Sequence, residues 1–169
     1  MPSDVEEALA PGPLADAVPR LALDKARAVA TRMGEGVVLG ADTIVVIDGE
    51  PLGKPADATD ARVMLRRLRG REHEVITGVA VVDARTGRSQ ATAVVSRVRM
   101  AEYGEGEIEA YVATGEPLDK AGAYAIQGRG GALVAGLEGS FSNVVGLPLA
   151  ETAGLLAAFG VAVSVPPEP

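Results

Sequence analysis

The stretch VVLGADTIVVI, residues 37–47, combines aliphatic and β-branched residues with one charged residue, Asp42. Such a run is typical of a buried strand, and the Asp48-Gly49 pair that follows indicates a tight turn. Burying an unpaired carboxylate is costly, so Asp42 needs a metal ion, a lysine or backbone donors as its partner. Asp42 is therefore the best candidate for a catalytic carboxylate, although a strand-end aspartate that caps a turn fits the pattern equally well.

Working outward from this strand, the pattern alternates between helical and extended segments. Apolar residues at helical spacing and a capping sequence at Asp57 predict the first two helices. Two strand-like segments flank a turn at residues 85–88 and are expected to form a long antiparallel pair. The predicted helices span residues 13–33, 57–70, 106–114 and 148–159, and the further strands span residues 75–84, 91–100 and 132–137.

The composition limits the kinds of ligand and site that this chain can have. A chain of 169 residues with 47% hydrophobic residues suits one folded domain, and its net charge of −7 disfavours a nucleic acid polymer while allowing a small anion in a local basic pocket. There is no cysteine, and His73 is the sole histidine. Thiolate chemistry and two-histidine metal sites are thereby excluded, and an exposed structural role is expected for His73. No apolar run suits a membrane span or a signal peptide, so we expect a cytoplasmic protein.

Lysine is rare in this chain. Three lysines stand against thirteen arginines, at positions 25, 54 and 120. An arginine-rich composition that retains lysine at a few positions suggests sites that require a compact charge on a flexible stem. Chance placement accounts equally well for any one of them, and Lys120 fits a structural ion pair as well as a ligand contact.

Residues 115–131 form a long segment that is dense in glycine and charge. Long ordered loops are usually functional. This loop lacks both the Gly-Lys-Ser/Thr ending of a P-loop and the Gly-x-Gly-x-x-Gly pattern of a dinucleotide fold. A different kind of binding site is therefore expected here.

Several separate motifs, in one order and spacing, resemble those of the Maf nucleotide pyrophosphatases. The resemblance implies an α/β fold of the Maf/ITPase type, with an elongated mixed sheet flanked by helices in a single domain of two lobes. It also implies hydrolysis of nucleoside triphosphates to the monophosphate and pyrophosphate. The matching segments are DVEE at 4–7, RLALDKARA at 20–28, GADT at 40–43, GKP at 53–55, DKAGAYAIQG at 119–128 and NVVGLPL at 143–149.

The same resemblance implies roles for individual residues. Asp42 matches the general base, and Glu7 together with Asp42 matches the ligands of a divalent metal, Mg²⁺ or Mn²⁺. Lys25 and Lys54 match residues that neutralise phosphate charge, while Thr43 and Gln127 match residues that face the nucleoside or its phosphate. The segment GSFSNVVGLPL at 139–149 is more similar to the dTTP/UTP branch of the family, and a homodimer is a further possibility that the chain leaves open.

The family's opening strand and its Ser-x-Ser-Pro-Arg-Arg loop have no counterpart in these 169 residues. We therefore expect a Maf-like domain over residues 1–169 that lacks both, with weakened phosphate binding. The alternative is a catalytically impaired, nucleotide-binding regulatory protein linked to cell division.

Overall fold

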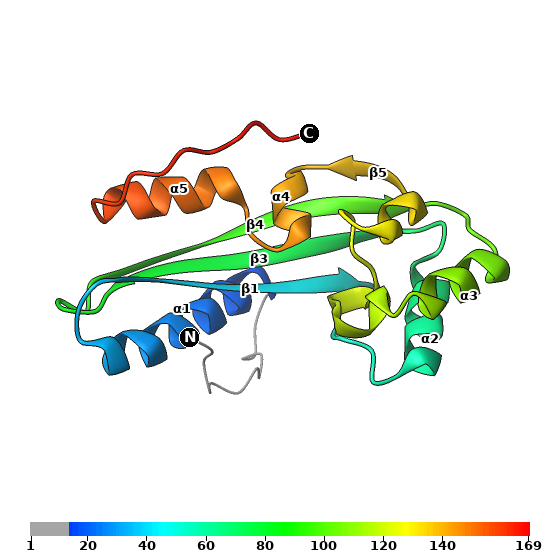
Figure 1. The fold of residues 1–169 in the computed structure, drawn as a ribbon, viewed down its shortest axis with the longest axis horizontal. Coiled ribbons are helices and arrows are strands. Elements are labelled where there is room, and N and C mark those ends of the chain that lie inside the picture. Colours follow the sequence, from blue (N-terminus) through cyan, green and yellow to red (C-terminus); the bar gives the residue numbers. More distant parts are fainter. Residues whose placement is uncertain (1–13) are drawn as a thin grey trace.

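The computed structural model describes residues 14–169, which form an α/β fold around one elongated five-stranded sheet (Figure 1). The strands lie in the order β2-β1-β3-β4-β5. Every pairing among them is antiparallel. The expected α/β class and elongated sheet are confirmed, while the described strands contain no parallel pair of the kind that a mixed sheet requires. The strands are β1 (Val37–Ile47), β2 (Glu50–Leu52), β3 (Glu72–Asp83), β4 (Ser89–Met100) and β5 (Val134–Glu138).

Strand β1 has the bounds that its sequence predicts, and its two edges differ. It pairs with β3 from Val37 to Val46, but with β2 only over its last three residues, Val45 to Ile47. Asp48 and Gly49 make the predicted turn, with φ values of 54° and 76°, as a two-residue hairpin of type I′ requires. Residues 37–44 therefore present one edge without a ladder partner in the described part of the chain.

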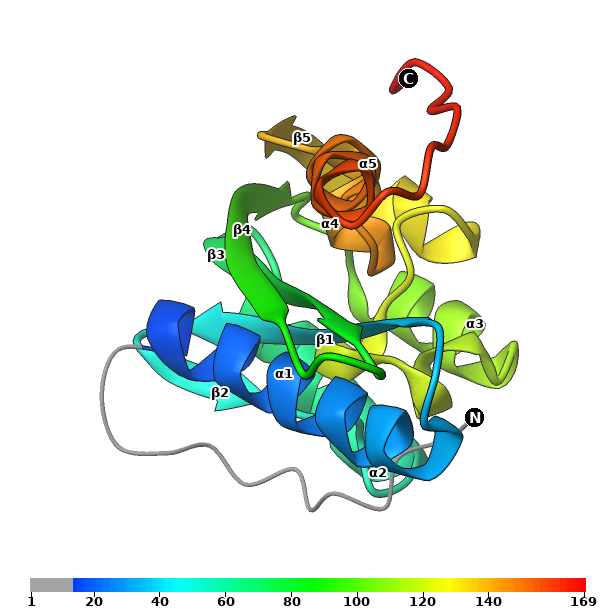
Figure 2. The ribbon, with the colours of Figure 1, turned by 90° about the vertical axis from the view of Figure 1, so that its left-hand side faces the viewer.

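Helix α1 (Leu14–Met33) crosses one face of the sheet (Figure 2) and approaches it very closely at two glycines. A Cβ atom at Gly40 would lie 2.5 Å from the carbonyl oxygen of Ala22, and one at Gly78 would lie 2.5 Å from the nitrogen of Pro19. Only glycine leaves room for this contact. The two glycines therefore fix how deeply α1 sits on β1 and β3.

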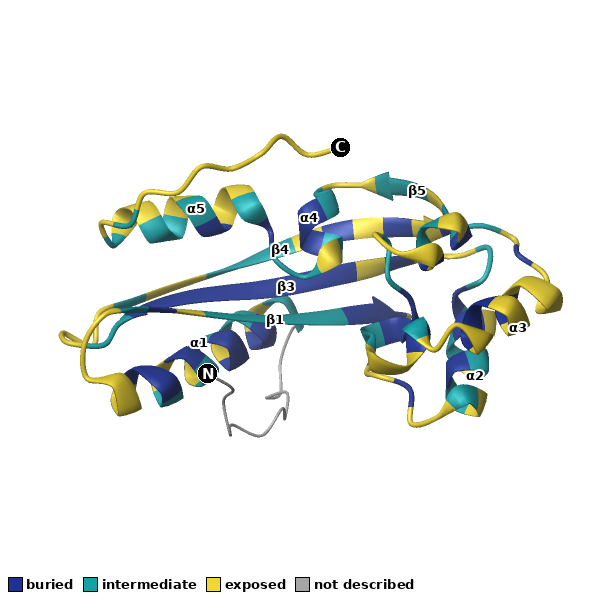
Figure 3. Cartoon of the chain, viewed as in Figure 1, coloured by how far each residue is buried: buried dark blue, intermediate teal, exposed yellow. Residues whose placement is uncertain are grey.

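The apolar core consists of three clusters, and strand β3 is buried along most of its length (Figure 3). The larger cluster joins one end of the sheet to α2 (Ala58–Leu68) and α3 (Glu105–Ala113), and the smaller ones lie under α1. Strand β3 lies between β1 and β4, and its residues from Val75 to Val82 are almost entirely buried. Among residues 14–169 no helix is long and apolar enough to span a bilayer.

Residues 115–133 are ordered by side chains rather than by long elements. They contain three short 3₁₀ helices, at Glu116–Asp119, Ala121–Ala123 and Arg129–Leu133. The carboxylate of Glu116 accepts hydrogen bonds from the hydroxyl of Tyr111 and from the backbone nitrogens of Arg129 and Gly130, over 2.8–3.1 Å. The carboxylate of Glu116 thus joins the two ends of the long segment for which the sequence predicts a binding site.

Two helices follow β5 on the face of the sheet opposite α1. Helix α4 (Phe141–Val145) begins at Ser140, whose hydroxyl accepts from the backbone nitrogen of Asn143 at 3.1 Å. Helix α5 (Leu149–Ala158) contacts β3 and β4. The prediction of a helix at 148–159 is confirmed, whereas the sequence pattern does not predict α4.

The expectation of an exposed His73 is wrong. His73 lies at the start of β3, but it is only 2% exposed, and its ring contacts the side chain of Tyr124. A contact between residues 51 positions apart leaves no local signal in the sequence.

Candidate active site

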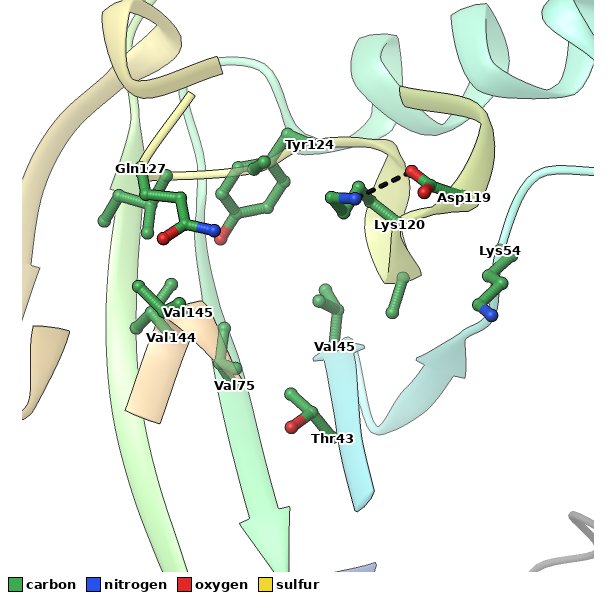
Figure 4. Close-up of a pocket in the computed structure, with 13 residues that line it drawn as sticks. Thr43, Val45, Lys54, Val75, Asp119, Lys120, Tyr124, Gln127, Val144 and Val145 are labelled. Atoms are coloured by element: carbon green, nitrogen blue, oxygen red, sulfur yellow. Dashed lines mark hydrogen bonds and ion pairs between the residues drawn. The ribbon is translucent and has the colours of Figure 1, made fainter. Parts of the chain in front are cut away.

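Two neighbouring hollows lie beside the partly open edge of β1, and Thr43, Lys54 and Ala121 line both. The first has a volume of about 190 Å³ and extends toward Tyr124 and Gln127 (Figure 4). The second, of about 480 Å³, extends toward Asp42. Because the two hollows share these three residues, they adjoin. Together they form one site whose two parts differ in chemistry.

Asp42 and Lys25 form an ion pair at the edge of the second hollow. The Nζ atom of Lys25 donates to Oδ1 of Asp42 over 2.9 Å, and their side chains are 15% and 12% exposed. Lys25 comes from α1, which the glycine contacts hold against β1, so the pair depends on that close approach. Of the partners that the sequence allowed for Asp42, the structure shows a lysine.

Thr43 follows Asp42 in β1, and strand alternation turns its side chain to the opposite face of the sheet. There its Oγ1 lies 2.8 Å from Oγ1 of Thr77 and donates to the carbonyl oxygen of Gly146 over 3.3 Å. Thr77 in turn donates to the carbonyl oxygen of Asn143. Asp42 and Thr43, consecutive residues of β1, therefore point to opposite faces of the sheet at the place where the two hollows meet.

The Asn143 side chain anchors α4 to the sheet. Its Nδ2 atom donates to Oγ of Ser96 over 2.8 Å and to the carbonyl oxygen of Val75 over 3.3 Å. Val144 and Val145, the next two residues, line the first hollow. Thr77, Ser96 and Asn143 support the site without having been singled out from the sequence, because each is recognisable only by its partners across the fold.

One end of the first hollow is cationic. Lys120 donates to Asp119 over 2.8 Å, and this hydrogen bond lowers the pKa of Asp119 below its ordinary value, with a smaller contribution from the charge of Lys54. The backbone nitrogen of Gly122 donates to the carbonyl oxygen of Gly53 over 3.1 Å, so the segment that carries Lys120 is tied to the one that carries Lys54. The ammonium groups of Lys54 and Lys120 therefore both lie at this end of the first hollow.

The other end of the first hollow is apolar with one amide. Gln127 and Tyr124 lie together on this side in Figure 4, above Val144, Val145 and Val75. An amide offers both a donor and an acceptor, and apolar walls suit a planar ring. The hollow thus passes from a cationic end to an end suited to a nucleobase.

Five of the six residues proposed from the sequence lie at these hollows or contact a residue that does: Lys25, Asp42, Thr43, Lys54 and Gln127. Glu7 lies outside the described residues. Within residues 14–169, no group of three or more histidine or acidic side chains is arranged to hold a metal ion. Of the three lysines of the chain, Lys54 and Lys120 line these hollows and Lys25 pairs with Asp42.

Comparison with known proteins gives one consistent result. A family model described as "Maf-like protein" matches residues 1–159. A dTTP/UTP pyrophosphatase of Anaeromyxobacter sp. (strain Fw109-5) is 62% identical over 160 residues, covering 92% of this chain and 76% of the relative. The dTTP/UTP pyrophosphatases of Anaeromyxobacter dehalogenans (strain 2CP-C) and Moorella thermoacetica are 58% and 56% identical, covering 92% and 89% of this chain and 79% and 78% of the relatives.

Proposed function

Because the chain belongs to the Maf-like protein family, we propose that it hydrolyses dTTP and UTP to the nucleoside monophosphate and pyrophosphate. The observation that carries this proposal is the site itself. A partly buried carboxylate paired to a lysine stands beside a hollow whose one end is cationic and whose other end is apolar with an amide. A nucleoside triphosphate has the same sequence of chemical groups, from anionic phosphates to a planar base.

In the proposed reaction Asp42 orients a water molecule and accepts its proton. The water oxygen forms a bond to the α-phosphorus, the bond from that phosphorus to the bridging oxygen breaks, and the electron pair leaves with pyrophosphate. A general base of this kind contributes about 10²- to 10⁴-fold to the rate. Asp42 suits the role because it lines the second hollow next to the shared residues Thr43 and Lys54.

Lys25 and Lys54 are proposed to neutralise the phosphate oxygens. Negative charge builds on the leaving pyrophosphate, so a cation positioned there stabilises the transition state more than the ground state. Lys54 lines both hollows, and Lys25 is held beside Asp42 by α1. Lys120, on the same wall as Lys54, adds a third ammonium group to this end.

A divalent metal is proposed to bind at Asp42. Mg²⁺ is commonly bound through one or two carboxylates together with substrate phosphates, so Asp42 would supply one such carboxylate and Glu7, outside the described residues, would supply the second. Mg²⁺ or Mn²⁺ bound there would screen the charge of the triphosphate. Lys25 already contacts one oxygen of Asp42, so the pair would also keep that carboxylate in a fixed orientation toward the ion.

Gln127 and Thr43 are proposed to recognise the nucleoside. The Gln127 amide can pair with the donor and acceptor edge of a pyrimidine, while Val144 and Val145 pack on the ring. Thr43 already bonds to Thr77 and Gly146, so it is held in place before a ligand arrives. The relatives' names do not favour the alternative, a nucleotide-binding regulator without turnover.

The deciding experiment measures pyrophosphate release by the 169-residue chain from dTTP, UTP, dCTP, ATP and GTP, with Mg²⁺, with Mn²⁺ and with a chelator. Metal-dependent release of pyrophosphate that is strongest with dTTP and UTP is expected. Binding of dTTP without any release would instead support the regulatory alternative.

A further inference from the structure

His73 and Tyr124 form a buried pair beneath the wall of the first hollow. The Nε2 atom of His73 lies 2.7 Å from the hydroxyl oxygen of Tyr124, and the two rings meet edge to face with centroids 5.4 Å apart. Both side chains are almost inaccessible, at 2% and 5% exposed. The roles assigned to Asp42, the lysines and Gln127 leave this pair unexplained.

Tyr124 lines the first hollow between its cationic end and its apolar end. Four residues before it, Lys120 stands at the cationic end, and three residues after it, Gln127 stands at the other. The neighbouring backbone is held by Gly122, which donates to Gly53, and by Ala125, which donates to the hydroxyl of Tyr111 over 3.0 Å. The Tyr124 side chain joins this wall to β3 of the sheet through His73.

The direction of this hydrogen bond depends on the tautomer of His73. Nδ1 of His73 is buried and has no hydrogen-bond partner in the part of the chain that the structure describes. Nδ1 is therefore an unpaired donor in one tautomer and an unpaired acceptor in the other, and either state costs about 1–3 kcal/mol. In both tautomers the uncharged ring holds the Tyr124 hydroxyl through Nε2, either by accepting its hydrogen or by donating to its oxygen.

We propose that His73 is a positioning residue for the substrate pocket, acting through the Tyr124 hydroxyl to hold the wall between Lys120 and Gln127 in its binding geometry. This inference rests on the proposed function and extends it to a residue that touches no substrate. Burial lowers the pKa of His73 to about 4, so the ring keeps the uncharged form that this arrangement uses at neutral pH. A histidine that merely filled the core would affect stability but not substrate affinity.

Steady-state kinetics separate these two roles. In Tyr124→Phe and in His73→Phe the KM for dTTP should rise roughly three- to tenfold, the loss of one hydrogen bond, with a smaller change in kcat. The double variant should lose no more than the worse single variant, because both changes remove one interaction. His73→Gln, whose amide can replace Nε2 as a donor or as an acceptor, should restore most of the affinity.

Tyr103→Phe is the matched control. Tyr103 is equally buried and its hydroxyl donates to the carbonyl oxygen of Leu65 over 2.6 Å, but it lines neither hollow. Its loss should lower stability and leave the KM for dTTP unchanged. An unchanged KM in Tyr124→Phe, or an equal rise in Tyr103→Phe, overturns the proposal. If His73→Phe does not fold, Tyr124→Phe removes the same bond with little change in shape.

Two readouts need no activity and so keep this inference apart from the proposed function. Backbone hydrogen exchange at residues 119–128, without nucleotide, should be faster in Tyr124→Phe than in the wild type and unchanged in Tyr103→Phe. ¹⁵N NMR of the single imidazole should show an uncharged ring at neutral pH in the wild type. If the wild type releases no pyrophosphate but these results hold, the function fails and the coupling stands. If the wild type is active and exchange is unaltered, the coupling fails.

Discussion

At the scale of single residues, the ion pair of Asp42 and Lys25 is the most informative contact of the site. Two groups of opposite charge are almost withdrawn from water and lie 2.9 Å apart. Removing one partner of such a pair leaves the other charge uncompensated, which costs more than the pair contributes. A variant of Asp42 therefore tests both the chemistry and the packing.

Asp42→Asn should reduce kcat by at least about 100-fold, because the amide keeps the shape but cannot accept the proton of water. The dissociation constant for dTTP should change much less. Both are measured in the full chain with Mg²⁺, by pyrophosphate release and by calorimetry. Asp83→Asn, at the last residue of β3 and outside both hollows, is a control that should behave as the wild type. Wild-type turnover in Asp42→Asn contradicts the assignment of the base.

Lys54→Arg should impair activity almost as much as Lys54→Ala. A guanidinium is a broad planar fork, whereas the wall that Lys54 shares with Lys120 suits compact ammonium groups. The measurement is kcat/KM for dTTP in both variants. Near-normal activity in the arginine variant shows that the rarity of lysine in this chain carries no functional meaning.

At the scale of elements, the contact of α1 with the sheet sets the geometry of the ion pair. In Gly78→Ala the added Cβ would lie 2.5 Å from a backbone atom of Pro19, so α1 must move. We expect a loss of about 1–3 kcal/mol in the free energy of unfolding and lower turnover, because Lys25 moves with the helix. Urea unfolding and kcat give the two results. Gly136→Ala in β5, with nothing within 4 Å, should leave both unchanged.

Sequence periodicity and turn chemistry predicted most elements because these signals are local. Strand β1, its Asp48-Gly49 turn and the long pair of β3 and β4 are all as expected. Helix α4 was missed because five residues are too few to show a helical period, and Asn143 holds them through contacts with distant strands. The burial of His73 could not be predicted for the same reason, because its partner Tyr124 lies 51 residues away in the sequence.

For the site, the residue types and motif matches indicated Asp42, Lys25, Thr43, Lys54 and Gln127, which the fold brings together. The supporting shell of Thr77, Ser96 and Asn143 could not be predicted in this way. Threonine, serine and asparagine are common in strands and caps, and their role here depends on which residues they contact across the sheet.

At the scale of the whole molecule, His73 couples stability to acidity. Its pKa is about 4 in the folded state and about 6.5 when unfolded. Between these values the unfolded state binds more protons, so the free energy of unfolding rises with pH and levels off above about 6.5. The difference amounts to about 3 kcal/mol. Urea unfolding of the wild type from pH 4 to 7 should show a steeper slope than His73→Phe, and identical slopes would contradict the prediction.

The open edge of β1 is a second property of the whole molecule. Residues 37–44 have no ladder partner on one side within the described chain, and exposed edges favour pairing with another chain. Leu39→Lys should therefore reduce self-association, measured by sedimentation at increasing concentration. Val63→Lys, at an exposed position of helix α2, is the control, and an equal effect of both variants would point away from the edge.

Every lysine of the chain lines one of the two hollows or pairs with a residue that does, which makes the chain unusual toward acylating reagents. Apart from the α-amino group, an amine-selective reagent finds three targets in 169 residues, and each lies at the site. The arginine-rich remainder of the surface is inert to it. Acylation would therefore act as an inhibitor rather than as a general modification of the surface, and bound nucleotide would shield the same three amines. Mass spectrometry of the three lysines would therefore measure the fraction of pockets that hold a nucleotide.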